Sequence, residues 1–158
     1  MSPFRPAALL ILSLAASPAV AESSQISATQ AWSRPAAAGG AGAGYLTLVN
    51  RGKADILVGA SSPLASRVEL HSASMTGGMM RMDAESRVPV PAGGQIKFAP
   101  GGRHLMFVGL TRALHVGDTL PATLRFASGR TLTVNLKVAV GAPEAPPKVP
   151  MGEMPGMH

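Results

Sequence analysis

Apolar and polar residues alternate with a period of two along much of the chain, which is the pattern of β-strands with one buried face. In residues 131–140, leucine or valine occupies every even position, and threonine, asparagine or lysine occupies the odd positions up to Lys137. Residues 120–126 alternate in the same way, ahead of a turn at Ser128-Gly129. Further strands are predicted at Gln25–Trp32, Gly44–Asn50, Asp55–Ala60, Arg67–His71, Met79–Met82, Gln95–Ala99 and His104–Gly109.

Turn-forming sequences separate these runs, because glycine supplies positive φ and proline holds φ at a fixed negative value. The chain has 18 Gly, 14 Pro and only 4% aromatic residues. Short strands joined by such turns favour an antiparallel sandwich or barrel over βαβ units. No long segment has helical periodicity, and 158 residues suffice for one domain with a hydrophobic core.

The first 21 residues are typical of a secretory signal peptide. Arg5 gives a short positive region, an apolar stretch follows at residues 7–16, and Ala19-Val20-Ala21 offers a cleavage pattern of small residues. The apolar stretch is too short to span a bilayer, which requires about 20 residues. No later run approaches that length. We therefore expect export to a bacterial periplasm, with no membrane span after removal of residues 1–21.

The rest of the chain divides into three parts. Residues 22–140 contain the alternating runs and are expected to form the folded domain. Residues 141–150 read GAPEAPPKVP, and proline at this density predicts an extended linker, because it lacks an amide donor. Residues 151–158 form a short tail rich in methionine and ending in histidine.

Composition excludes several classes of function. The chain has no cysteine, so it has no disulfide, no thiolate metal site and no thiol nucleophile. Its 14 basic and 8 acidic residues are scattered, and aromatic residues are scarce, which argues against nucleic-acid binding despite a net charge of +6. Hydrolase motifs are absent, and the glycine-rich stretch 39–44 leads into a strand rather than a helix, so it is not a nucleotide loop.

Methionine and histidine are gathered in one part of the chain. Five methionines lie between Met75 and Met106, together with His104, and three more lie in the tail. Buried methionine usually fills gaps in a core. However, His104 and Met106 are two residues apart and share one strand face, and His71 is out of phase with its apolar neighbours Val68 and Leu70. Both histidines are therefore expected to lie where a ligand can reach them.

Imidazole and thioether groups together favour one kind of metal. Thioether sulfur is soft and neutral, so it suits Cu(I) and serves Zn(II), Mg(II) or Ca(II) poorly. It also needs no deprotonation, so affinity depends on pH mainly through histidine protonation, near pH ~6.5. A neutral site of this kind supplies no catalytic base. It indicates a copper carrier and not an enzyme.

The spacing H-x10-M-x21-H-x-M, formed by His71, Met82, His104 and Met106, closely resembles the PCu(A)C family of periplasmic copper chaperones. The similarity extends from residue 31 to about residue 140. It implies a single-domain, cupredoxin-like Greek-key β-sandwich with an exposed Cu(I) site made by these four residues. It also implies delivery of copper to the binuclear centre of cytochrome c oxidase subunit II, or to another copper-accepting assembly factor.

Other residues near the motif have alternative roles. The family often has methionine directly after the first histidine, where this chain has Ser72. Glu69 shares a face with His71 and can orient it, although a solvated surface carboxylate is the expectation. Three further methionines are near enough to be alternate ligands but are expected to pack or to face solvent: Met75, Met79 and Met80.

The tail is open to two interpretations. Its donors are Met151, Met154, Met157 and His158, which can form a second, weaker copper site, including one for Cu(II) through His158. The alternative is a terminus without a metal.

Two rival functions use the same fold. An electron-transfer cupredoxin needs a thiolate ligand, which this chain lacks. Copper sequestration without a delivery partner uses the same four residues, and the sequence does not separate it from delivery. The protein is expected to be a monomer, with its ligands gathered at one end of the sandwich, and His115 is expected to be a loop residue outside the site.

Overall fold

The computed structural model describes residues 25–143, so the predicted signal peptide, most of the linker and the tail lie outside the described residues. Within this range the chain forms β-strands and no helix, as the alternation predicts. The strands are β1 (Ile26–Ser33), β2 (Ala41–Asn50), β3 (Asp55–Ser61), β4 (Ala65–Thr76), β5 (Met79–Ala84), β6 (Val88–Val90), β7 (Gln95–Phe98), β8 (Arg103–Leu110), β9 (Thr119–Phe126) and β10 (Thr131–Val138).

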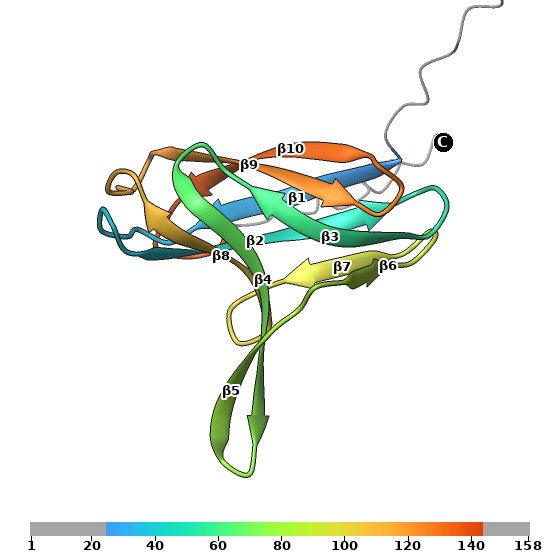
Figure 1. Cartoon of the computed structure of the whole chain (residues 1–158), viewed down its shortest axis with the longest axis horizontal. Helices are drawn as coiled ribbons and strands as arrows, with labels where there is room; N and C mark the ends of the chain where they lie inside the picture. Colours follow the sequence, from blue (N-terminus) through green and yellow to red (C-terminus); the bar gives the residue numbers. More distant parts are fainter. Residues whose placement is uncertain (1–24, 144–158) are drawn as a thin grey trace, which may run out of the picture.

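Seven of these strands form a closed, barrel-like sheet in the order β4, β8, β2, β1, β10, β9 and β3 (Figure 1). The ring closes where β3 meets β4, with Ala60 opposite Val68. β1 and β10 pair in parallel, and the other pairs in the ring are antiparallel. β7 adds to β2, and β6 adds to β3. No helix within residues 25–143 is long and apolar enough to cross a membrane.

Every strand predicted from alternation is present, although several bounds differ and one strand is additional. β2 begins at Ala41 instead of Gly44. β6 was not predicted, because a three-residue strand with proline at its centre has too little pattern to recognise. β4 was predicted to end at His71 but continues to Thr76, because its second half pairs with β5 instead of covering the core. That second half contains few apolar residues, so the hydrophobic pattern does not reveal it.

The core lies inside the ring and fixes which side chains face outward. Leu70 of β4 is opposite Leu105 of β8, and both are buried. Phe107, two residues further along β8, is also fully buried. Because successive side chains of a strand point to opposite faces, the residues that precede or follow these buried positions lie on the outer surface of the sheet. His71 and His104 are among them.

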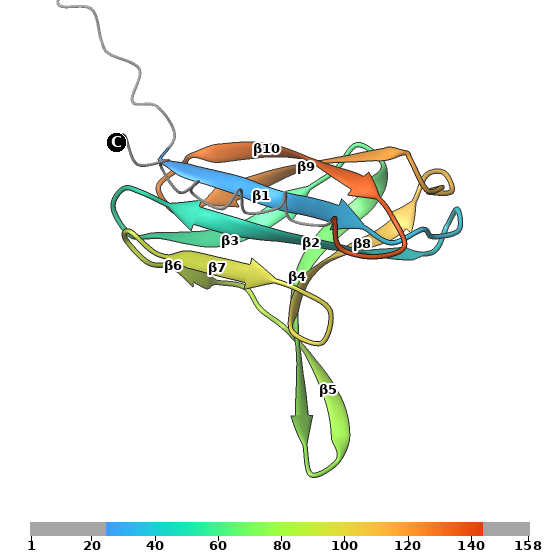
Figure 2. The same ribbon diagram turned by 180° about the vertical axis from the view of Figure 1, so that it is seen from behind.

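The β4–β5 hairpin projects away from the barrel (Figures 1 and 2). Its two-residue turn is Gly77-Gly78, with φ of 60° and 78°. A tight hairpin turn of the I′ type requires positive φ at both positions, which glycine adopts without strain. At the base of the hairpin, Arg103 of β8 donates two hydrogen bonds to the Glu85 carboxylate, at 2.9 and 3.3 Å.

Two glycines of β2 provide a test of how tightly the core is filled. A Cβ added at Gly44 would lie 2.7 Å from both Leu136 and Phe107, whereas one added at Gly42 would meet only ordinary contacts, at 3.4 Å or more. We expect Gly44→Ala to lower the free energy of unfolding by about 1–3 kcal/mol through overpacking. Gly42→Ala is the matched control and is expected to change it by less than about 1 kcal/mol. Denaturant unfolding measures both, and equal midpoints for the two variants would contradict this account.

Candidate metal centre

Two histidines from neighbouring strands lie side by side on the outer face of the barrel. His71 of β4 is directly opposite His104 of β8 in the antiparallel register. Their ring centroids are 5.7 Å apart, and the ring planes are inclined by 43°. Because residues directly opposite each other project from the same face, this pairing brings together two imidazoles that are 33 positions apart in the chain.

One nitrogen of His71 contacts a carboxylate, and the other has no hydrogen-bond partner in the described part of the chain. His71 Nε2 lies 2.8 Å from Glu69 Oε2. His71 Nδ1 is buried and has no hydrogen-bond partner among residues 25–143. A carboxylate that accepts from one imidazole nitrogen leaves the lone pair of the other available to a metal. Glu69 therefore orients His71. From the sequence this role is possible, but a solvated surface carboxylate is the expectation.

Glu69 is held in its charged form. The Arg67 guanidinium donates to Glu69, and together with the contact from His71 it holds the pKa of the Glu69 carboxyl below its ordinary value. Arg67, Glu69 and His71 alternate along β4, so all three lie on the outer face. The charged carboxylate is a good acceptor for the His71 Nε2–H group.

His104 is the more deeply placed of the two histidines. Its residue is 5% exposed, although it points away from the core. Gly102 O lies 3.3 Å from His104 Nδ1 and also accepts from the Ala73 amide at 3.1 Å. The segment between β7 and β8 thus holds both His104 and the start of the projecting hairpin. The Nδ1 contact leaves Nε2 as the ring nitrogen of His104 available for a ligand.

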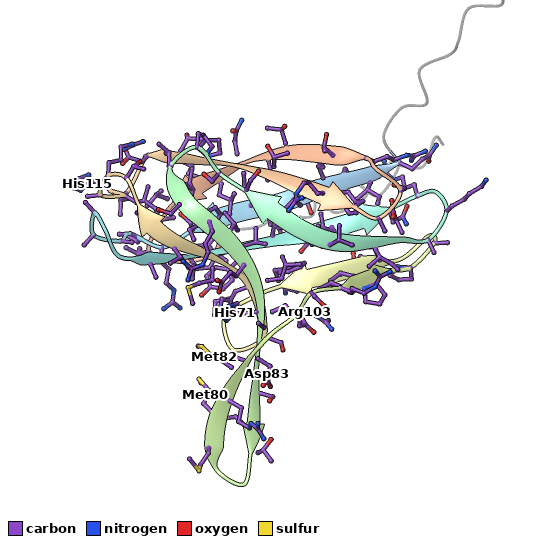
Figure 3. The ribbon with its side chains drawn as sticks, viewed as in Figure 1. His71, Met80, Met82, Asp83, Arg103 and His115 are labelled. Atoms are coloured by element: carbon purple, nitrogen blue, oxygen red, sulfur yellow. The ribbon has the colours of Figure 1, made fainter. Side chains whose placement is uncertain are left out.

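The two predicted thioethers lie on the same face as the histidines. Met106 follows His104 by two residues and is opposite Glu69. Met82 of β5 is opposite Ala73, which follows His71 by two residues, and it is 56% exposed. Figure 3 shows His71 at the base of the hairpin and Met82 just beyond it. The register of three strands therefore brings all four predicted residues to one face.

A solvent-open cleft of about 220 Å³ joins most of these groups. Three of the four predicted residues line it, and the fourth, His71, lies beside His104 without lining the cleft. The lining residues are Arg34, Ala43, Tyr45, Ala73, Met80, Met82, Pro100, Gly101, His104 and Met106. Tyr45 packs against the buried Trp32, with ring centroids 4.8 Å apart and ring planes inclined by 40°, so the cleft wall continues into an aromatic pair.

The structure also places the neighbouring residues whose roles the sequence left open. Met75 and Met79 face solvent, at 66% and 72% exposed, as expected. Met80 is also exposed at 61%, yet it lines the cleft. Ser72 is opposite Asp83 and hence on the other face of the hairpin. A methionine at position 72 would therefore not add a donor to the face that carries His71.

The chemistry of the face is that of neutral, polarizable donors. No group of three or more His, Cys, Asp or Glu that could hold a metal is found within residues 25–143, so these residues offer no hard-cation cage. Two imidazoles with thioethers form a donor set suited to a soft monovalent ion. His115 is exposed in a loop beside Asp118, outside this region, as expected. The tail residues lie outside the described residues.

Solved structures similar to this chain include PCuAC domains. The copper-bound PCuAC domain from PmoF2 has a TM-score of 0.60 and 25% identity, over 75% of this chain and 94% of that one. The apo PCuAC domain from PmoF1 has a TM-score of 0.61 and 23% identity, over 75% and 95%. Apo-DR1885 from Deinococcus radiodurans has a TM-score of 0.52 and 32% identity, over 87% and 95%. The expected all-β, cupredoxin-like fold is confirmed.

Sequence comparison gives the family. A putative lipoprotein, Lxx21020 from Leifsonia xyli subsp. xyli, is 36% identical over 115 residues, which are 72% of this chain and 69% of that protein. The family described as putative lipoprotein LpqE-like matches residues 26–138, the whole barrel. The resemblance to PCu(A)C proteins is supported by the structural neighbours, whereas the family whose model matches is the LpqE-like one. The chain belongs to the LpqE-like family, and its barrel has the fold of a PCuAC domain.

Proposed function

We propose that this protein is a copper chaperone that binds one Cu(I) ion through His71, Met82, His104 and Met106 and passes it to an acceptor protein. The observation that carries the proposal is the cross-strand histidine pair, with two thioethers on the same face beside a solvent-open cleft. The similarity to the copper-bound PCuAC domain from PmoF2 supports copper as the ion.

The ring nitrogens that do not face Glu69 or Gly102 fit such an ion. His71 Nδ1 is a buried polar atom without a partner in the described range, and ligation by a metal would satisfy it. His104 contributes Nε2, because Nδ1 faces the Gly102 carbonyl. The thioethers of Met82 and Met106 add soft donors that carry no charge. The copper ion is cargo: its coordination bonds form and break, and no covalent bond of the protein changes.

The exposure of the four residues sets the direction of transfer. His104 is buried and the His71 side chain is 18% exposed, whereas Met82 is 56% exposed on the projecting hairpin. A ligand from an acceptor therefore reaches the ion from the side of Met82. Because a neutral thioether is also a weaker donor than imidazole to most metals, Met82 is the ligand to be replaced first.

The proposed compartment rests on the N-terminal sequence, and the proposed acceptor rests on the family resemblance. We infer that residues 1–21 direct export to the periplasm, which fits a family and a relative that are named as lipoproteins. The proposed acceptor is the binuclear copper centre of cytochrome c oxidase subunit II, or another copper-accepting assembly factor. The predicted second site in the tail, formed by Met151, Met154, Met157 and His158 and including Cu(II) among its ions, stays part of the proposal.

Replacement of His104 tests the site. We expect His104→Ala to weaken Cu(I) binding by at least about 100-fold, because the buried imidazole is a ligand and not only an orienting group. The measurement is an anaerobic Cu(I) titration against a competing chelator. His115→Ala is the matched control, since that histidine is exposed and remote, and it should bind as the parent does. If His104→Ala binds Cu(I) as tightly as the parent protein does, the assignment of this site is wrong.

The tautomers of the two histidines test the roles of their partners. In the metal-free protein we expect His71 to carry its proton on Nε2, facing Glu69, and His104 on Nδ1, facing Gly102 O. Nitrogen-15 NMR of the neutral imidazoles distinguishes the two forms. Glu69→Ala should mix the tautomers of His71 and leave His104 unchanged. The same tautomer on both rings would contradict this assignment of metal-binding nitrogens.

A transfer assay separates delivery from sequestration. The Cu(I)-loaded protein is mixed with the metal-free copper domain of oxidase subunit II, and copper in each protein is measured after separation. A chaperone gives up its ion to the acceptor, and transfer from the loaded protein should be faster than from a chelator buffered to the same free Cu(I). Retention of copper, with the same affinity and no transfer, would support a sequestration protein instead.

A further inference from the structure

The β4–β5 hairpin sorts its side chains by type between its two faces. On the face that carries His71, Met75 is directly opposite Met80, and Ala73 is opposite Met82. The other face carries the pairs Ser72–Asp83, Ser74–Arg81 and Thr76–Met79. Figure 3 shows Met80 and Met82 directed to one side of the hairpin and Asp83 to the other. One face is therefore lined by thioethers, and the other is mostly polar.

Packing does not account for the thioether face. Met75, Met80 and Met82 are 66%, 61% and 56% exposed, on a hairpin that stands away from the core. Methionine in a core fills irregular gaps, but these side chains fill none. Exposed strand positions favour β-branched residues such as threonine, which this hairpin uses at Thr76.

The register brings two of these sulfurs within reach of one ion. Directly opposite residues have Cβ atoms about 4.5–5.5 Å apart, and the methionine side chain has three rotatable bonds. Met82 follows Met80 by two residues on the same face, and both line the cleft that contains His104 and Met106. A line of soft donors therefore runs from the hairpin turn to the histidine pair.

We propose that Met75 and Met80 form an outer site for a soft monovalent cation, Cu(I) or Ag(I), which Met82 connects to the inner site. The direction of transfer rests on the proposed function, whereas the outer site itself requires only the hairpin. Two thioethers without imidazole bind more weakly than the inner set, so the outer site captures an ion and releases it inward. No proton and no electron moves in this step.

The test reads each methionine separately. The full chain carrying His71→Ala and His104→Ala, which lacks the inner imidazoles, is labelled with carbon-13 at the methionine methyl groups and titrated with Ag(I) in chloride-free buffer. The signals of Met75 and Met80 should shift together and saturate, and that of Met79 should not. If only the methyl groups of Met151, Met154 and Met157 respond, or if none responds, the outer site does not exist.

A matched pair of variants tests whether the site lies on one face of the hairpin. Adding Met75→Leu and Met80→Leu to the same background should weaken Ag(I) binding at the hairpin by at least about tenfold, or 1.4 kcal/mol, with little change in side-chain volume. Adding Met79→Leu, which removes an equally exposed thioether from the opposite face, should change it by less than about twofold. Equal losses in both variants would overturn the proposal.

Two further outcomes are distinguishable. If the proposed function is wrong, His104→Ala binds Cu(I) as tightly as the parent protein does. The response of the hairpin methionines to Ag(I) is then unchanged. If the Met75 and Met80 signals respond to an acceptor protein but not to Ag(I), the hairpin face is a protein-docking surface, and the outer site is rejected.

Discussion

The register between β4 and β8 is the constraint on which the rest of the molecule depends. Leu70 and Leu105 form one opposite pair on the inner face, and His71 and His104 form the next on the outer face. A shift of β4 by one residue would turn the histidine into the core and the leucine outward. Because the leucine pair lies fully within the apolar core, its burial holds the imidazoles opposite each other. The geometry of the histidine pair is thus fixed from inside the barrel.

The sequence predicted the parts of this arrangement that depend on local periodicity. Alternation located the strands, and the phase of His71 against Val68 and Leu70 correctly placed it on the outer face. Periodicity could not show that β4 pairs with β8, because these strands are distant in the chain. It also could not show that His104 Nδ1 faces the Gly102 carbonyl, because a side-chain contact depends on the rotamer and on the turn, which alternation does not specify. The same holds for the choice of Glu69 between an orienting contact and solvent. The ligand set itself came from the resemblance, and it stays a prediction.

The proposed donors are arranged by depth as well as by type. His104 is buried, His71 is partly covered, and the methionines become more exposed along the hairpin. The nitrogen donors lie where water and partners have little access, and the sulfur donors of the hairpin lie where access is greatest, whereas Met106 on β8 is partly buried. A sheet produces such a gradient simply, because one strand face continues from the barrel into a free hairpin. In this proposal, the affinity for the ion depends on positions in the barrel, and the exchange of the ion depends on positions in the hairpin.

The aromatic pair in the cleft wall has a consequence for spectroscopy. Trp32 is the single tryptophan of the chain. It packs against Tyr45, which lines the cleft. The indole is buried in the barrel wall, so its emission reports a defined environment. Tyr45 is both a lining residue of the cleft and a direct neighbour of the indole, with ring centroids 4.8 Å apart. The protein thus carries an intrinsic optical probe at the wall of its own cleft, which needs no added dye.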